Sequence, residues 1–292
     1  MKKTSPTCHI SRLFAELLVL FALLGTGAHA QWLNYPTPGT PRTPDGKPNL
    51  TAPAPRALDG KPDLSGAWHV HATPIAEMKR IFGDNVGLTN VPGMEIDTLS
   101  KYALNIFVDM KPQEAPIRPQ AAEIFRRRAA GQETRGICLP VGIPASGLVS
   151  EATKIVQSPR LMVILYESDG THRQIYTDGR ELPKEFEQPA WLGYSAGKWV
   201  GDTLVVESAG FNDKTWLDLN GHPHGEALRV VERLHRRDFG HLDVETTFDD
   251  PEMYTKPFGI KYTFDLLPDS DVFENICENE KDSAHMVKEP AK

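Results

Sequence analysis

Alternation of apolar and polar residues along the second half of the chain is the feature that most constrains its fold. From Thr153 almost to the end, short runs with a period of two are separated by glycine, asparagine, aspartate and proline. One face of residues 241–248 consists of Leu242, Val244, Thr246 and Phe248, and residues 258–266 repeat the pattern. Such runs predict strands with one buried and one wet face, and therefore an antiparallel sheet.

Further strands are expected at 160–167, 171–177, 202–208 and 227–239, with Asp169-Gly170 as a hairpin turn between the first two. Residues 160–167 are continuously apolar, which predicts burial on both faces. About eight or nine strands with short turns close into a barrel or fold into a sandwich, because closure removes unpaired edges. A barrel of that size is wide enough to hold one small ligand. We therefore expect a mainly β chain with a single antiparallel β-barrel.

The first thirty residues have the pattern of a secretory signal peptide. Basic residues precede an apolar stretch at 17–24, and Ala28-His29-Ala30 forms a small-residue cleavage site. The apolar stretch is too short for a membrane span. We expect residues 1–30 to be removed and the protein to be periplasmic or secreted.

A proline-rich segment, residues 31–62, separates this leader from the barrel domain. It contains Asp-Gly-Lys-Pro twice, at 45–48 and at 59–62, which predicts an extended arm with two Asp-Gly turns. The barrel domain is expected at 63–280, followed by a flexible C-terminal tail at 281–292. One short helix is predicted at 119–130, because Pro119 begins it and three arginines precede Gly131. Residues 100–110 are expected to form a short helix or strand.

Charge and cysteine content exclude some partners and suggest a cross-link. The chain has 32 basic and 39 acidic residues, and loss of the leader would leave 29 and 38, which argues against a nucleic-acid partner. The sequence contains neither a Walker loop nor a G-x-G-x-x-G motif after a strand, so a nucleotide cofactor is not expected. Two cysteines, Cys138 and Cys277, would remain after export. We predict that they form a disulfide, worth about 4–5 kcal/mol because it closes a long loop.

Several motifs resemble those of known proteins. Gly66-Ala67-Trp68 and Gly197-Lys198-Trp199 resemble the G-x-W strand entries of lipocalin-like (calycin) barrels. The stretches 176–180, 191–199, 201–207, 210–218 and 250–257 resemble a large family of secreted, mostly uncharacterised bacterial proteins. That resemblance covers roughly residues 60–280 and implies export, but it brings no activity with it. The lipocalin-like fold follows from the strand pattern.

The densest cluster of chemically active side chains lies at 216–226. Asp218, His222, His224 and Glu226 occur within nine positions, and side chains two apart on an extended segment point the same way. The histidines could chelate a divalent metal with Asp218 or Glu226. Pro223 between them and the preceding Asn-Gly also fit a plain turn. We expect no cofactor here, with a metal at His222 and His224 as an open alternative.

The same residues could perform acid-base chemistry without a metal. His222 or His224 would carry the proton, and Asp218 would assist. Arg180 or Arg233 would bind an anionic substrate or stabilise negative charge that develops on it. Aromatic and polar residues nearby in sequence suggest the walls of a small-molecule pocket. The candidate ligand-binding residues are Tyr176, Asp178, Trp191, Tyr194, Trp216, Glu232 and Tyr254. Ser195 matches G-x-S-x-G, but a strand and not a helix is expected after it, so we interpret the match as a coincidence.

Three functions therefore remain open. The first is an exported enzyme of isomerase, lyase or hydrolase type acting on a small organic molecule inside the barrel. The second is a non-catalytic carrier of lipocalin type for an aromatic or apolar molecule. The third is a metal-binding protein. Convergence of the two histidines with Arg180 or Arg233 on one cavity would favour the enzyme.

Overall fold

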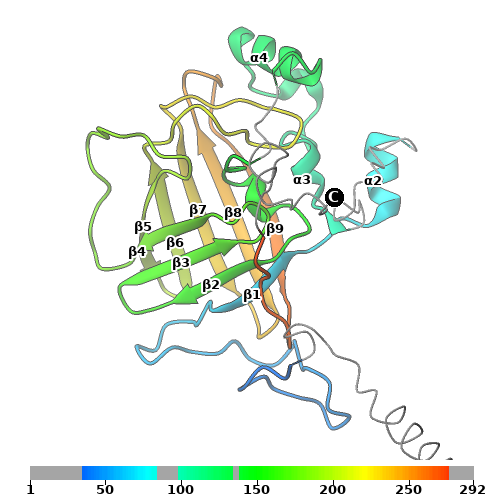
Figure 1. The fold of residues 1–292 in the computed structure, drawn as a ribbon, viewed down its shortest axis with the longest axis vertical. Coiled ribbons are helices and arrows are strands. Elements are labelled where there is room, and N and C mark those ends of the chain that lie inside the picture. The colour runs from blue at the N-terminus through cyan, green and yellow to red at the C-terminus, as the bar shows by residue number, and fades with distance from the viewer. Residues whose placement is uncertain (1–34, 84–97, 134–137, 276–292) are drawn as a thin grey trace, which may run out of the picture.

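A computed structural model describes residues 35–83, 98–133 and 138–275. Its main element is a closed barrel of nine strands, in which each strand pairs with the next along the chain and the last pairs with the first (Figure 1). The strands are β1 (Gly66–Val70), β2 (Thr153–Gln157), β3 (Leu161–Tyr166), β4 (His172–Tyr176), β5 (Tyr194–Val200), β6 (Thr203–Ala209), β7 (Arg229–Arg236), β8 (His241–Asp249) and β9 (Phe258–Leu266). The predicted single barrel is confirmed.

Alternating burial shows which face of each strand lines the barrel. In β8 the four residues predicted to share the apolar face are all buried, while the residues between them are half-buried or exposed. Across the β7–β8 pair, Glu232 lies opposite Thr246 and Leu234 opposite Val244. These residues face inward, and each large apolar side chain buried there contributes about 1.5–3 kcal/mol to folding.

Strand β3 differs from its prediction. Met162, Ile164 and Tyr166 are buried, whereas Val163 and Leu165 between them are only half-buried. A closed barrel has one interior, so a strand in its wall can bury only one face completely. The continuous apolar run therefore reflects partial cover of the outer face and not a second core.

One pair of neighbouring strands is parallel. Strand β4 meets β5 through two register pairs, Ile175 with Ser195 and Tyr176 with Ala196. To reach a parallel neighbour, the chain must return along the barrel, and residues 177–193 do this as a wide loop beside β4 and β5 (Figure 1). All other neighbouring strands are antiparallel. The barrel wall thus has its shortest pairing between β4 and β5.

Helices gather at one end of the barrel (Figure 1). Helix α4 (Pro119–Ala129) confirms the helix predicted at 119–130, and α3 (Lys101–Leu104) forms within the expected segment 100–110. A further helix, α2 (Ile75–Phe82), has no counterpart in the sequence-based predictions, and it buries only Met78 completely. Among the described residues, no helix combines the length and the apolar character needed to cross a membrane.

The proline-rich arm lies at the opposite end of the barrel (Figure 1). Both predicted turns form, because the amide of Gly46 donates to Thr43 O and that of Gly60 donates to Ala57 O. The structural repeat is longer than the four residues noted above. Residues 41–50 and 55–64 form two similar loops, here termed clips, each closed by a bridge between its arginine and the proline of its Asp-Gly-Lys-Pro sequence, Arg42 with Pro48 and Arg56 with Pro62. The leader 1–30, Cys277 and the tail 281–292 lie outside the described residues.

Candidate functional site

A pocket of about 490 Å³ lies in the barrel wall where β4 and β5 pair for only two residues. Residues 170–176 form one side, and residues 190–195 form the other. Three predicted ligand-binding aromatics, Tyr176, Trp191 and Tyr194, line it together. Small-molecule sites usually have volumes of about 300–1,000 Å³ and aromatic walls with a few polar groups. We refer to this cavity as the wall pocket.

Neighbouring side chains hold the aromatic walls in place. Tyr194 stacks on Phe186 with ring centroids 5.4 Å apart, and its hydroxyl donates to Gln188 O at 2.9 Å. The guanidinium of Arg180 lies 3.8 Å from the Tyr176 ring centroid. The ammonium of Lys214 lies 5.7 Å from that of Trp191. A cation at such a distance is attracted electrostatically to the face of the ring. Two of the three aromatic walls therefore have a positive charge next to them.

Two residues of the pocket lining, Arg173 and Ser195, belong also to a buried polar cluster. Arg173 forms an ion pair of 2.5 Å with Glu232, and its side chain and that of Glu232 are only 2% and 10% exposed. Its Nε donates to Ser195 Oγ at 3.0 Å and its Nη2 to Ser208 Oγ at 2.7 Å. Burial alone would lower the pKa of Arg173, but the adjacent Glu232 carboxylate outweighs it and raises the pKa above its ordinary value. The guanidinium therefore stays charged.

Other polar groups surround this ion pair inside the barrel. Burial raises the pKa of Tyr166 to about 12, and burial together with Glu232 raises that of Tyr262, so both phenols are neutral. The hydroxyl oxygen of Thr153, which lies opposite Tyr166 in register, is buried without a hydrogen-bond partner among the described residues. Buried polar atoms are normally hydrogen-bonded, so Thr153 can still accept or donate one hydrogen bond inside the barrel.

Arg173 and Ser208 are absent from the sequence-based candidates, although the sequence contains a signal for Arg173. In the strand predicted at 171–177, Arg173 shares a face with Ile175, and in 227–239 Glu232 shares one with Val230 and Leu234. A charged residue at an inward position needs a partner, because an unpaired buried charge is costly. Opposite charges on two inward faces could therefore have predicted this pair.

Ser195 lies within strand β5, and strand β6 follows it, so a strand and not a helix comes after the motif, as expected. Its hydroxyl contacts the hydroxyl of Ser208 at 2.9 Å and accepts a hydrogen bond from Arg173. Arg173 cannot take the proton of Ser195 because a guanidinium has no acceptor, and the other partner, Ser208, is a neutral hydroxyl and not a general base. The G-x-S-x-G match is not a strand-turn-helix elbow.

His222 and Asp218 form a separate buried pair below α4. The Nδ1 atom of His222 lies 2.5 Å from Asp218 Oδ2, and the imidazole stacks on Phe125 with a centroid distance of 4.1 Å. Asp218 also accepts a backbone hydrogen bond from Ile106 at 2.8 Å. The amides of residues 220–222 donate to its other oxygen. This carboxylate thus organises a turn and fixes the histidine ring.

His224 has separate partners. Its Nδ1 lies 3.1 Å from Gly225 O, so it donates there, and its Nε2 lies 2.7 Å from Thr215 Oγ1 and accepts from that hydroxyl. Burial lowers the pKa of His224, which favours this neutral form. Among the residues that the structure describes, no group of three or more histidine, cysteine, aspartate or glutamate side chains could hold a metal ion. The open alternative of a metal at His222 and His224 gains no support from this arrangement.

The remaining candidates are spread over the molecule. Arg233 is exposed on the outer face of β7, and Arg180 is exposed and bonded to Asp178. That hydrogen bond lowers the pKa of Asp178 to about 2. The guanidinium of Arg128 lies 5.0 Å from the Trp216 ring centroid. The Tyr254 hydroxyl donates to Pro223 O at 2.6 Å. The structure brings together Tyr176, Trp191 and Tyr194, with Glu232 behind them, and places the histidines elsewhere.

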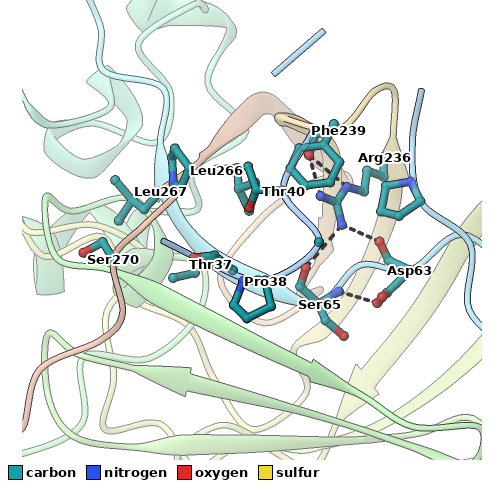
Figure 2. A pocket seen from close by; sticks show the side chains of 15 residues that line it. Thr37, Pro38, Thr40, Asp63, Ser65, Arg236, Phe239, Leu266, Leu267 and Ser270 are labelled. Carbon is teal, nitrogen blue, oxygen red and sulfur yellow. Dashed lines mark hydrogen bonds between the residues drawn. The ribbon is translucent and has the colours of Figure 1, made fainter. Parts of the chain in front are cut away.

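A smaller pocket of about 290 Å³ lies at the arm end of the barrel, beside Arg236. Figure 2 shows the Arg236 guanidinium directed at backbone carbonyls of Asp63, Ser65 and Phe239. The guanidinium also lies 4.8 Å from the Trp68 ring centroid. Burial lowers the pKa of Arg236 to about 10, which leaves it charged at neutral pH. Backbone carbonyls accept hydrogen bonds from this guanidinium, so we interpret Arg236 as a structural residue that closes this end of the barrel and not as part of a ligand site.

Comparison with known proteins found no matching family model, no matching curated protein and no matching solved structure.

Proposed function

We propose that this protein binds a small planar organic molecule in the wall pocket, as a carrier or binding protein of the kind suggested by its lipocalin-like motifs. The observation that supports this proposal is the grouping of Tyr176, Trp191 and Tyr194 around one cavity with Arg173 and Ser195 in its lining. Flat aromatic walls favour a flat ligand, because each ring contact adds about 0.5–1.5 kcal/mol beyond simple area burial.

Acid-base catalysis by His222 or His224 receives less support. His222 is held by Asp218 and stacked on Phe125, while His224 uses both ring nitrogens in hydrogen bonds. Neither residue lines the wall pocket. A proton carrier must reach its substrate within hydrogen-bond distance or through one water. We therefore favour the carrier over the enzyme.

Export belongs to the same proposal. A signal peptide ending near Ala30 would place the mature protein in the periplasm or outside the cell, where a carrier meets molecules from the environment. Cell fractionation with N-terminal sequencing of the exported protein tests this part, and an intact leader on cytoplasmic protein would contradict it.

The binding experiment compares two exposed tyrosines. Tyr194 is 40% exposed and lines the pocket, whereas Tyr35 is 59% exposed and does not. A panel of one- and two-ring aromatic compounds is screened by thermal shift, and binders are measured by calorimetry. We expect Tyr194→Ala to weaken binding by about tenfold, since losing one ring contact costs about 1.4 kcal/mol. Tyr35→Ala should bind like the wild type. A panel without binders, or equal losses in both variants, would refute the proposal.

A further inference from the structure

The charge distribution around the wall pocket is opposite to that of the whole chain. The chain has 39 acidic and 32 basic residues. Nevertheless, none of the described residues that line the pocket is acidic. A cavity with apolar walls and one sign of charge nearby concentrates ligands of the opposite sign. The lining itself therefore places no negative charge that would repel an anion, and the source of positive charge has to be sought next to it.

The nearby charges are not all available to a ligand. Asp178 offsets the charge of Arg180, and Glu232 offsets that of Arg173. Lys214 differs, because it forms no ion pair within the part of the chain that the structure describes. Its ammonium lies beside the Trp191 ring at 5.7 Å. Lys214 is thus the cation best placed to contribute uncompensated charge at an aromatic wall.

Ser195 adds no hydrogen-bond donor on the side of the pocket where the aromatic rings lie. Its side chain is only 2% exposed, and its hydroxyl bonds to Arg173 and Ser208 on the buried side of the strand, whereas the adjacent Tyr194 is 40% exposed. Successive side chains of a strand point to opposite faces, so the rings and this buried cluster lie on opposite faces of the barrel wall. The positive charge available to a ligand is therefore that of Lys214.

We infer that the wall pocket is selective for aromatic anions, such as aromatic carboxylates, over uncharged or cationic aromatics of the same shape. The ring would stack against Trp191 and Tyr194, and the carboxylate would lie toward Lys214. This inference rests on the proposed function, since it names the ligand class of the same pocket.

The test uses three probes of equal ring size and different charge: 2-naphthoate, 2-naphthamide and 2-naphthylmethylamine. Calorimetry at low and high salt measures their dissociation constants for the mature protein. We expect naphthoate to bind about tenfold more tightly than the amide, equivalent to about 1.4 kcal/mol, and the amine to bind most weakly. Added salt should reduce the advantage of naphthoate, because exposed charges are screened.

Two lysine variants locate the effect. Lys214→Met keeps an unbranched apolar chain but removes the charge, and should weaken naphthoate binding about threefold to tenfold while leaving the amide unchanged, as expected for one partly exposed charge. Lys198→Met is the control, because Lys198 is an exposed lysine of β5 that, unlike Lys214, makes no cation–π contact with a pocket aromatic among the described residues. It should alter neither probe.

The outcomes separate the inference from the proposed function. If the amide or the amine binds as tightly as naphthoate, the anion preference is wrong while the pocket still binds an aromatic molecule. A loss in Lys214→Met that is equal for naphthoate and amide would also overturn the preference. If none of the three probes binds and Tyr194→Ala changes nothing in the wider panel, both the inference and the proposed function fail.

Discussion

Arg173 and Glu232 illustrate how single residues shape this barrel from within. They are 59 positions apart in sequence but form a nearly buried ion pair of 2.5 Å. Removing two charges from water is costly, and a buried pair often stabilises a fold no better than apolar residues would. The cluster is therefore not expected to stabilise the fold more than apolar residues of the same volume would. His224 shows a different type of residue-scale effect, because its burial favours the neutral ring.

His224 should make the protein sensitive to acid. Its pKa in the folded state is lowered below the ordinary value of 6.5, so the unfolded chain binds its proton first as pH falls. The stabilisation by neutral His224 is complete above about pH 6.5 and is lost as pH falls toward the folded-state pKa, by at most about 1.4 kcal/mol per pH unit for one proton. Urea unfolding from pH 8 to pH 5 measures this slope.

Substitution His224→Gln should flatten that slope, whatever its effect on absolute stability at pH 8. The amide keeps one donor and one acceptor but does not titrate. His69, whose pKa burial also lowers, should retain its own contribution in this variant. An unchanged slope in His224→Gln would show that His224 does not titrate between the two states.

The arm clips are the clearest element-scale repeat in the structure. In both, the arginine donates to a glycine carbonyl of its own turn, at 3.1 Å for Arg42 and 2.9 Å for Arg56. Each arginine also binds an aspartate of the barrel end, Asp269 at 2.5 Å and Asp202 at 2.7 Å. Figure 1 shows the arm following this end of the barrel. Each copy of the repeated sequence therefore attaches the arm to the end of the barrel through its arginine.

Replacing both arginines should loosen the arm while leaving the barrel folded. In Arg42→Ala/Arg56→Ala, we expect faster hydrogen exchange at residues 41–64, because both contacts with the barrel and both turn contacts are lost. The amides of β7 and β8 should stay protected. Lys47→Ala is the matched control, since Lys47 pairs with Asp45 of its own turn and not with the barrel. Unchanged exchange in the double variant would mean that the arginines do not hold the arm.

At the scale of the whole molecule, distant segments converge on the turn between β3 and β4. The amide of Val141 donates to Asp169 Oδ2 at 2.7 Å, and the side-chain amide of Asn275 donates to Glu167 O at 2.9 Å. Val141 is three residues after Cys138, and Asn275 is two residues before Cys277. This convergence supports the predicted disulfide, which would join the middle of the chain to its end.

A bond between Cys138 and Cys277, as the sequence predicts, should contribute a large part of the stability of the protein. We expect Cys138→Ser, Cys277→Ser and the double variant to lose the same amount, up to about 4–5 kcal/mol on the chain-entropy estimate. Denaturant unfolding with and without reductant measures it, and reductant should affect only the wild type. Additive losses in the double variant, or a wild type insensitive to reductant, would contradict a bond between these cysteines.

The alternating pattern by itself determined which face of each strand is buried, because a period of two places every second residue on the buried face whatever the partner strand. Other local signals in the sequence placed the helix at 119–130 and both arm turns, and the aromatic residues that line the wall pocket were among the candidates it named. The sequence could not show that β4 and β5 run parallel, since strand direction depends on the path of the loop 177–193. Only the tertiary structure separated the histidines from the aromatic pocket and brought Arg173 to Glu232, because such contacts depend on barrel closure and register rather than on proximity in sequence.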